Sequence, residues 1–182
     1  MNEEMLKIRK DIERLHTANV NEVIPLYPGI ELCYLTLSSD PLSVRHKAMP
    51  YMIQINYCKA GQMVWEMKNG NRIYLNPGDF SLHTMKACTD SVIRFPNGIY
   101  QGLTVCIDLQ EAAGNPPEPL KNSSIFETIL PEKFCQNDHP VFLAGNEQTE
   151  TIFSAFYNQP EMLKLPYQRI KVLEVLLCLS KI

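Results

Sequence analysis

The chain has 182 residues, enough for one domain with a hydrophobic core, and its hydrophobic and charged contents of 45% and 20% are ordinary for a globular protein. Its formal net charge of −3 excludes the strongly basic surface of a nucleic-acid-binding domain. The N-terminal residues mix acidic and basic side chains without an apolar core, which excludes a signal peptide, and no later run is long enough for a membrane span. We therefore expect a cytoplasmic protein with no membrane segment and with its six cysteines reduced.

The first expected element is a helix over residues 1–17. Met5, Ile8, Ile12 and Leu15 share one face of it, and charged residues occupy the rest. This helix either lies against its own domain or forms an arm that exchanges with a partner subunit.

Residues 18–110 have the pattern of short antiparallel strands. Met63, Trp65 and Met67 alternate with polar residues, so they share one face of a strand. Asn69-Gly70 follows them and indicates a hairpin in which both turn positions need a positive φ. Short strands with closely spaced turns predict a small barrel or double-sheet roll rather than a fold of alternating strands and helices.

A proline-rich connector is expected over residues 111–121, because its prolines and Gly114 would interrupt a helix or a central strand. Over residues 122–182 the periodicity becomes helical. The last helix begins near Pro166 and is apolar around most of its circumference, so one side is expected to pack on the domain and the other on a partner. The chain stops within this pattern, and we expect the natural protein to continue. The residues expected to dimerise are Ile170, Leu173, Leu176 and Leu177.

Several segments together resemble a known family. They are Ile55-Asn56-Tyr57-Cys58-Lys59-Ala60-Gly61, Asn69-Gly70, Gly78-Asp79, Phe95-Pro96-Asn97-Gly98-Ile99-Tyr100 and Lys171-Val172-Leu173-Glu174. In these segments the chain resembles the N-terminal, cupin-like sensing domain of AraC/XylS-type transcription regulators. The resemblance covers nearly the whole chain and extends to the branch that includes siderophore-responsive regulators.

The resemblance implies a mostly β fold with helices: a cupin-like double-stranded β roll, followed by a C-terminal helical dimerisation segment. In this family the roll binds a small effector, the helices dimerise, and a helix-turn-helix domain binds DNA. The implied partners are therefore a small-molecule effector, siderophore-like in the related branch, and a second copy of the chain. DNA would be contacted only through a C-terminal domain that this sequence lacks.

Trp65 is the only tryptophan, and it lies between two methionines on its strand face. Methionine adapts to varied ligands, and indole offers a stacking surface and one N–H donor. Tyrosine hydroxyls, a histidine and an arginine nearby could add polar contacts. The candidate pocket residues are Tyr57, Met63, Trp65, Met67, His83, Arg94 and Tyr100.

The alternative function is that of a small metal-dependent cupin enzyme, an isomerase or a dioxygenase. Such an enzyme needs His-x-His with a following carboxylate on one strand and a further histidine on a later one. Met63-Val64-Trp65-Glu66 stands where that motif would fall, and His83 is a lone histidine. We therefore expect no metal, no cofactor and no catalytic residue. A third possibility is a pure dimerisation domain whose roll is filled by its own side chains.

Overall fold

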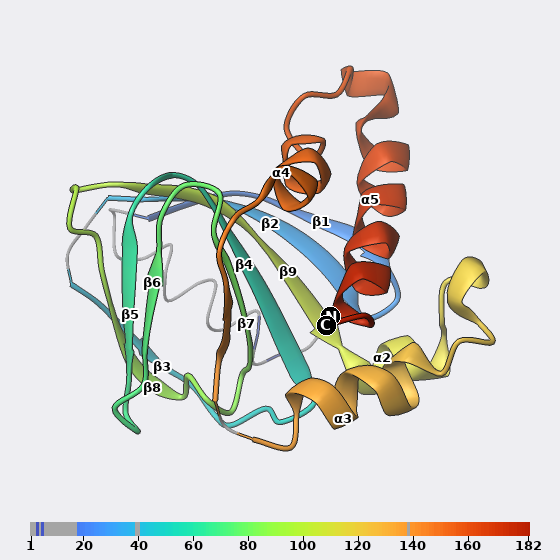
Figure 1. Ribbon diagram of the computed structural model, residues 1–182, viewed down its shortest axis with the longest axis horizontal. Helices are drawn as coiled ribbons and strands as arrows, with labels where there is room; N and C mark the ends of the chain where they lie inside the picture. Colours follow the sequence, from blue (N-terminus) through green and yellow to red (C-terminus); the bar gives the residue numbers. More distant parts are fainter. Residues whose placement is uncertain (1–2, 4, 6–17, 39–40, 138) are drawn as a thin grey trace.

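The computed structural model describes residues 3, 5, 18–38, 41–137 and 139–182 (Figure 1). The helix or arm expected over residues 1–17 lies almost entirely outside the described residues. None of the described helices is long and apolar enough to cross a membrane.

Within the described residues, two antiparallel sheets face each other (Figure 1). The larger sheet has the strand order β1-β2-β9-β4-β7-β10, and the smaller has the order β3-β8-β5-β6. The strands of the larger sheet are β1 (Ala18–Tyr27), β2 (Ile30–Leu37), β9 (Tyr100–Asp108), β4 (Met52–Gly61), β7 (Phe80–Thr84) and β10 (Val141–Leu143). Those of the smaller sheet are β3 (Leu42–Arg45), β8 (Asp90–Arg94), β5 (Met63–Met67) and β6 (Arg72–Leu75).

Helices cover the face of the larger sheet that points away from the smaller one (Figure 1). The helical elements are α2 (Leu109–Gly114), η1 (Glu118–Leu120), η2 (Ile125–Ile129), α3 (Leu130–Phe134), α4 (Glu147–Ser154), η3 (Glu161–Leu163) and α5 (Lys164–Leu179). The expected fold class, a mostly β roll followed by C-terminal helices, is therefore confirmed.

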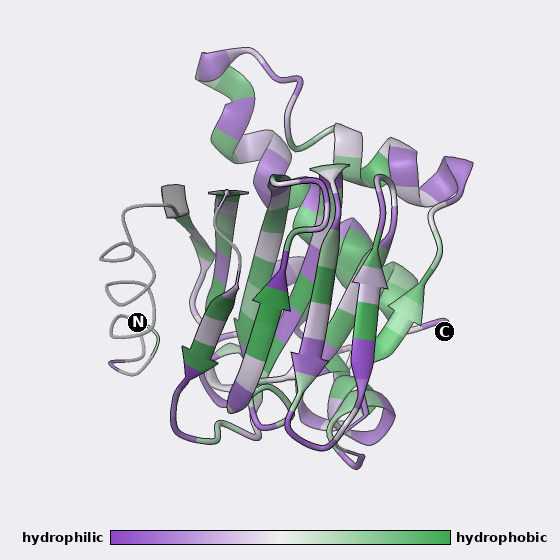
Figure 2. Ribbon diagram, turned by 90° about the vertical axis from the view of Figure 1, so that its left-hand side faces the viewer, coloured by the Kyte–Doolittle hydropathy of each residue, from purple (hydrophilic) through white to green (hydrophobic). Residues whose placement is uncertain are grey.

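Alternating side chains give the larger sheet two buried faces. The smaller sheet, which faces the viewer in Figure 2, alternates between hydrophilic and hydrophobic residues, because only one of its faces is buried. In β4, Ile53, Ile55 and Tyr57 point towards the helices and join a cluster of buried apolar residues, here called the outer cluster. Met52 and Cys58 point the other way and join the inner cluster, which fills the space between the two sheets. One sheet thus separates two cores, and this arrangement positions the candidate site.

Two local expectations were wrong in detail. The first residues of the connector expected over residues 111–121 belong to the helix α2, which ends at Gly114. This helix forms because the carboxylate of Asp108 accepts hydrogen bonds from the N–H groups of Gln110 and Glu111 and caps its N-terminus. The hairpin between β5 and β6 is present, but in its turn only Gly70 has a positive φ, of 86°. The carbonyl of Met67 accepts from the N–H of Gly70, which closes a four-residue turn whose last residue is this left-handed glycine.

Candidate ligand-binding cavity

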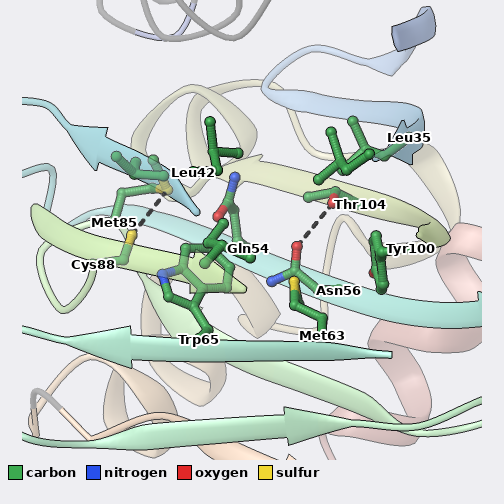
Figure 3. A pocket seen from close by; sticks show the side chains of 13 residues that line it. Leu35, Leu42, Gln54, Asn56, Met63, Trp65, Met85, Cys88, Tyr100 and Thr104 are labelled. Atoms are coloured by element: carbon green, nitrogen blue, oxygen red, sulfur yellow. Dashed lines mark hydrogen bonds between the residues drawn. The ribbon is translucent and has the colours of Figure 1, made fainter. Parts of the chain in front are cut away.

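A cavity of about 70 Å³ lies inside the roll, between the two sheets (Figure 3). It is small beside the roughly 300–1,000 Å³ of pockets that hold drug-sized ligands. Most of its wall is apolar, and its polar side chains come from β4 and β9. The lining residues are Leu35, Leu37, Leu42, Val44, Gln54, Asn56, Met63, Trp65, Met85, Cys88, Ile93, Tyr100 and Thr104.

Gln54 and Asn56 form the polar wall of this cavity and point from β4 towards β5 (Figure 3). The Oδ1 atom of Asn56 accepts from the hydroxyl of Thr104 at 2.8 Å, which fixes the orientation of the amide. The Nε2 atom of Gln54 lies 3.8 Å from the sulfur of Cys106. The other end of each amide, Nδ2 of Asn56 and Oε1 of Gln54, is buried and has no hydrogen-bond partner among the described residues.

The polar row continues onto β7, because Gln54 is paired in register with His83 and Asn56 with Ser81. The hydroxyl of Ser81 and both ring nitrogens of His83 are also buried without a partner within the described part of the chain. A buried polar group without a partner costs about 1–3 kcal/mol, so native proteins keep few of them. Such groups gathered beside a cavity indicate a site whose contents complete the hydrogen bonds.

Trp65 forms the opposite wall. Its indole N–H donates to the hydroxyl of Ser91 at 2.8 Å, and that hydroxyl donates to the carbonyl of Cys88 at 3.0 Å. The ring of His83 meets the indole edge-on, with centroids 4.6 Å apart. The hydrogen bond to Ser91 and the contact with His83 therefore fix the orientation of the indole ring, and Trp65 presents apolar surface to the cavity.

The ionisable groups around the cavity are kept neutral at pH 7. Burial, followed by the nearby His46, lowers the pKa of His83 from 6.5 to about 3. Burial raises the pKa of the Cys88 thiol to about 12, and it raises the pKa of Tyr100 well above its usual value. The Tyr100 hydroxyl donates to the carbonyl of Tyr57 at 3.1 Å. No lining residue among those described carries a charge at neutral pH.

The structure brings some of the expected pocket residues together and separates others. Met63, Trp65 and Tyr100 line the cavity. Met67 lies in the inner cluster without lining the cavity, and His83 lies beside Trp65.

The other two expected pocket residues lie elsewhere. Tyr57 points to the helical side of its sheet, where its ring stacks on Phe153 at 4.5 Å, because it follows the inward-pointing Asn56 by one position. Arg94 follows the inward-pointing Ile93 in the same way, and its exposed side chain pairs with Glu66 outside the roll at 3.4 Å. Neither side chain reaches the cavity.

Gln54, Asn56 and Thr104 were missed by the sequence analysis. The signal was present in β4, where two amides two positions apart interrupt the otherwise apolar run from Met52 to Cys58. On the two-residue period of a strand, they mark a polar stripe on a buried face.

The residues expected to dimerise differ in their exposure to solvent. Ile170 and Leu177 are exposed, by 62% and 46%, and Leu173 is half-buried. Leu176 was wrongly placed on this surface, because it lies fully buried in the outer cluster against the larger sheet. The described residues include no group of three or more His, Cys, Asp or Glu side chains that could hold a metal ion.

No protein-family model matches the chain, and no curated protein matches it. Solved structures do match. ToxT from Vibrio cholerae aligns with 84% of this chain at 10% identity and a TM-score of 0.55, and this chain spans 57% of the ToxT chain.

Two further structures align over about half of this chain or less. A cupin domain of an XRE-family transcriptional regulator from Enterobacter cloacae is 11% identical over 50% of this chain and 96% of its own, with a TM-score of 0.41. An HTH_3-family transcriptional regulator from Vibrio cholerae is 12% identical over 44% of this chain and 43% of its own, with a TM-score of 0.38. At 10% identity, the likeness to ToxT shows the fold alone.

Proposed function

We propose that this chain is the effector-sensing and dimerisation domain of a cytoplasmic bacterial transcription regulator of the AraC type, which binds a small molecule inside the β roll. The observation that carries the proposal is the cavity between the sheets, where Gln54 and Asn56 each leave one buried amide end unpaired. The AraC type rests on the resemblance in sequence, and the likeness to ToxT supports the fold over most of the chain.

The larger sheet offers a direct route from the cavity to the helices. Asn56 lines the cavity, and its neighbour Tyr57 stacks on Phe153 of α4. Leu35 also lines the cavity, and the hydroxyl of its neighbour Tyr34 accepts from Nε2 of Gln168 on α5 at 2.9 Å.

We expect a ligand that moves the inner face of this sheet to change how α4 and α5 sit on its outer face. Such a ligand shifts the population between two arrangements of the helices, provided that it binds them with different affinities. A separate DNA-binding domain would respond to that shift.

A second copy of the chain is the partner proposed for the outer surface of α5. The inner side of this helix is buried and includes Val172, Val175 and Leu176. Its outer side exposes Ile170 and Leu177, and Met162 in the preceding turn is 94% exposed. Exposed apolar side chains at helical spacing on a packed helix are typical of a helix-to-helix interface.

The enzyme alternative requires imidazole and carboxylate ligands that face into the roll. The described lining of the cavity contains neither, and the sulfur atoms of Met63, Met85 and Cys88 do not replace that set. The donor chemistry of the cavity therefore favours binding of an organic molecule.

Native mass spectrometry of the purified chain tests the proposed function. We expect a species of twice the 20.8 kDa subunit mass, without a transition metal. A monomer that carries one transition-metal ion per chain would contradict the proposal and support the cupin-enzyme alternative.

A further inference from the structure

The charge of the ligand follows from the cavity wall. The cationic side chain expected to meet an anion, Arg94, pairs with Glu66 outside the roll. His83 is fully buried, and its low pKa keeps it neutral. An ion that entered the cavity would lose its hydration without gaining an opposite charge, which strongly disfavours binding. The site therefore discriminates against carboxylates, phosphates and ammonium groups.

The hydrogen-bonding pattern of the ligand follows from the two amides on β4. The unpaired atom of Gln54, Oε1, is an acceptor and needs a donor from the ligand. The unpaired atom of Asn56, Nδ2, is a donor and needs an acceptor, while its Oδ1 is already engaged by Thr104. A group that carries an N–H and a carbonyl side by side satisfies both.

The size of the ligand follows from the volume. An engineered cavity of about 150 Å³ holds benzene, so the cavity of about 70 Å³ found here suits a molecule of roughly three or four non-hydrogen atoms before any side chain moves. Met63 and Met85 line the cavity, and their flexible thioethers can move to admit a slightly larger molecule. Trp65 and Leu35 leave the remaining surface apolar.

We infer that the ligand of the roll is a compact, uncharged molecule with an amide-type group, such as a small primary amide. This inference rests on the proposed function, because it names the class of effector for the same cavity. It does not favour a siderophore-like effector, which is too large and too polar for this volume.

Paired probes of equal shape and different charge test the inference. Propionamide and propionate are titrated separately at pH 7 into the purified chain, and emission from Trp65 reports binding because it is the only tryptophan. Ligands with so few atoms bind weakly, so we expect a millimolar dissociation constant for propionamide. We expect propionate to bind at least about tenfold more weakly, because its charge is not compensated.

Two independent variants locate the binding. Asn56→Leu and Gln54→Leu each remove one unpaired amide end, so each is expected to weaken propionamide binding about tenfold or more. The melting temperature of at least one should equal or exceed that of the natural chain, because a buried unpaired polar atom is lost. Gln110→Leu, at an exposed position, is the matched control and should bind as the natural chain does.

Each outcome separates the ligand class from the proposed function. Propionate binding as tightly as propionamide, with loss in Asn56→Leu, would overturn the uncharged class and leave the roll as a binding site. Failure of both probes to change Trp65 emission or the melting temperature would also overturn the amide class. The proposed function is tested separately, because a metal-loaded monomer in native mass spectrometry would contradict it.

Discussion

The His83→Phe variant is expected to be more stable than the natural chain at acidic pH and to lose the part of its acid sensitivity that arises at this position. The pKa of His83 is about 3 in the folded chain and 6.5 in a solvated one. Between these values the unfolded chain binds a proton that the folded chain excludes, so stability falls as pH falls through this window. The loss approaches ~1.4 kcal/mol per pH unit and is on the order of 5 kcal/mol across the whole window.

Urea unfolding at a series of pH values between 7 and about 4 measures this difference. At neutral pH the phenylalanine should also remove two buried unpaired nitrogens while keeping the edge-on contact with Trp65. His139→Gln, at an exposed histidine, is the control and should retain the acid sensitivity of the natural chain. If His83→Phe and the natural chain lost stability in parallel, His83 would not be a buried neutral residue.

The double variant Ile170→Asp, Leu177→Asp is expected to convert the proposed dimer into a monomer. Both side chains are exposed on α5, so their replacement leaves the core intact. In a dimer they would become buried at the interface, where two carboxylates per subunit would be desolvated near those of the partner. Burying an unpaired carboxylate costs roughly 2 kcal/mol or more at each position, so we expect the dissociation constant to rise by about 100-fold or more.

Sedimentation equilibrium over a range of concentrations gives this constant. Tyr51→Asp is a matched control, because Tyr51 is 55% exposed but lies in the turn immediately before β4. It should leave the association unchanged. A double variant that still dimerises like the natural chain would place the interface elsewhere.

The sequence correctly predicted which residues of β5 point into the roll. Met63, Trp65 and Met67 alternate with less buried residues in a strand that has one solvent-facing side. Their common direction could therefore be predicted from the period of two. Both faces of the larger sheet are covered, because helices pack on its outer side and the second sheet packs on its inner side. Both faces of its strands carry apolar residues, so alternation alone could not decide that Tyr57 points away from the cavity.

Helical periodicity had the same limit at α5. Ile170 and Leu176 are both apolar, and the sequence does not state which side of the helix meets the sheet. Packing decides it, because Leu176 is fully buried and Ile170 is 62% exposed. Asn56 could have been identified earlier, since an amide on a buried strand face must find a hydrogen-bond partner or provide one for a ligand.

Methyl spectra of the chain labelled with ¹³C-methyl methionine would test most directly whether a small molecule binds inside the roll. Met63 and Met85 line the cavity, whereas Met162 is 94% exposed on the helical side. On addition of propionamide, we expect the methyl resonances of Met63 and Met85 to shift with the same saturation curve, and those shifts to disappear in Asn56→Leu. Unchanged Met63 and Met85 resonances, with shifts confined to exposed methionines such as Met162, would contradict a binding site between the sheets.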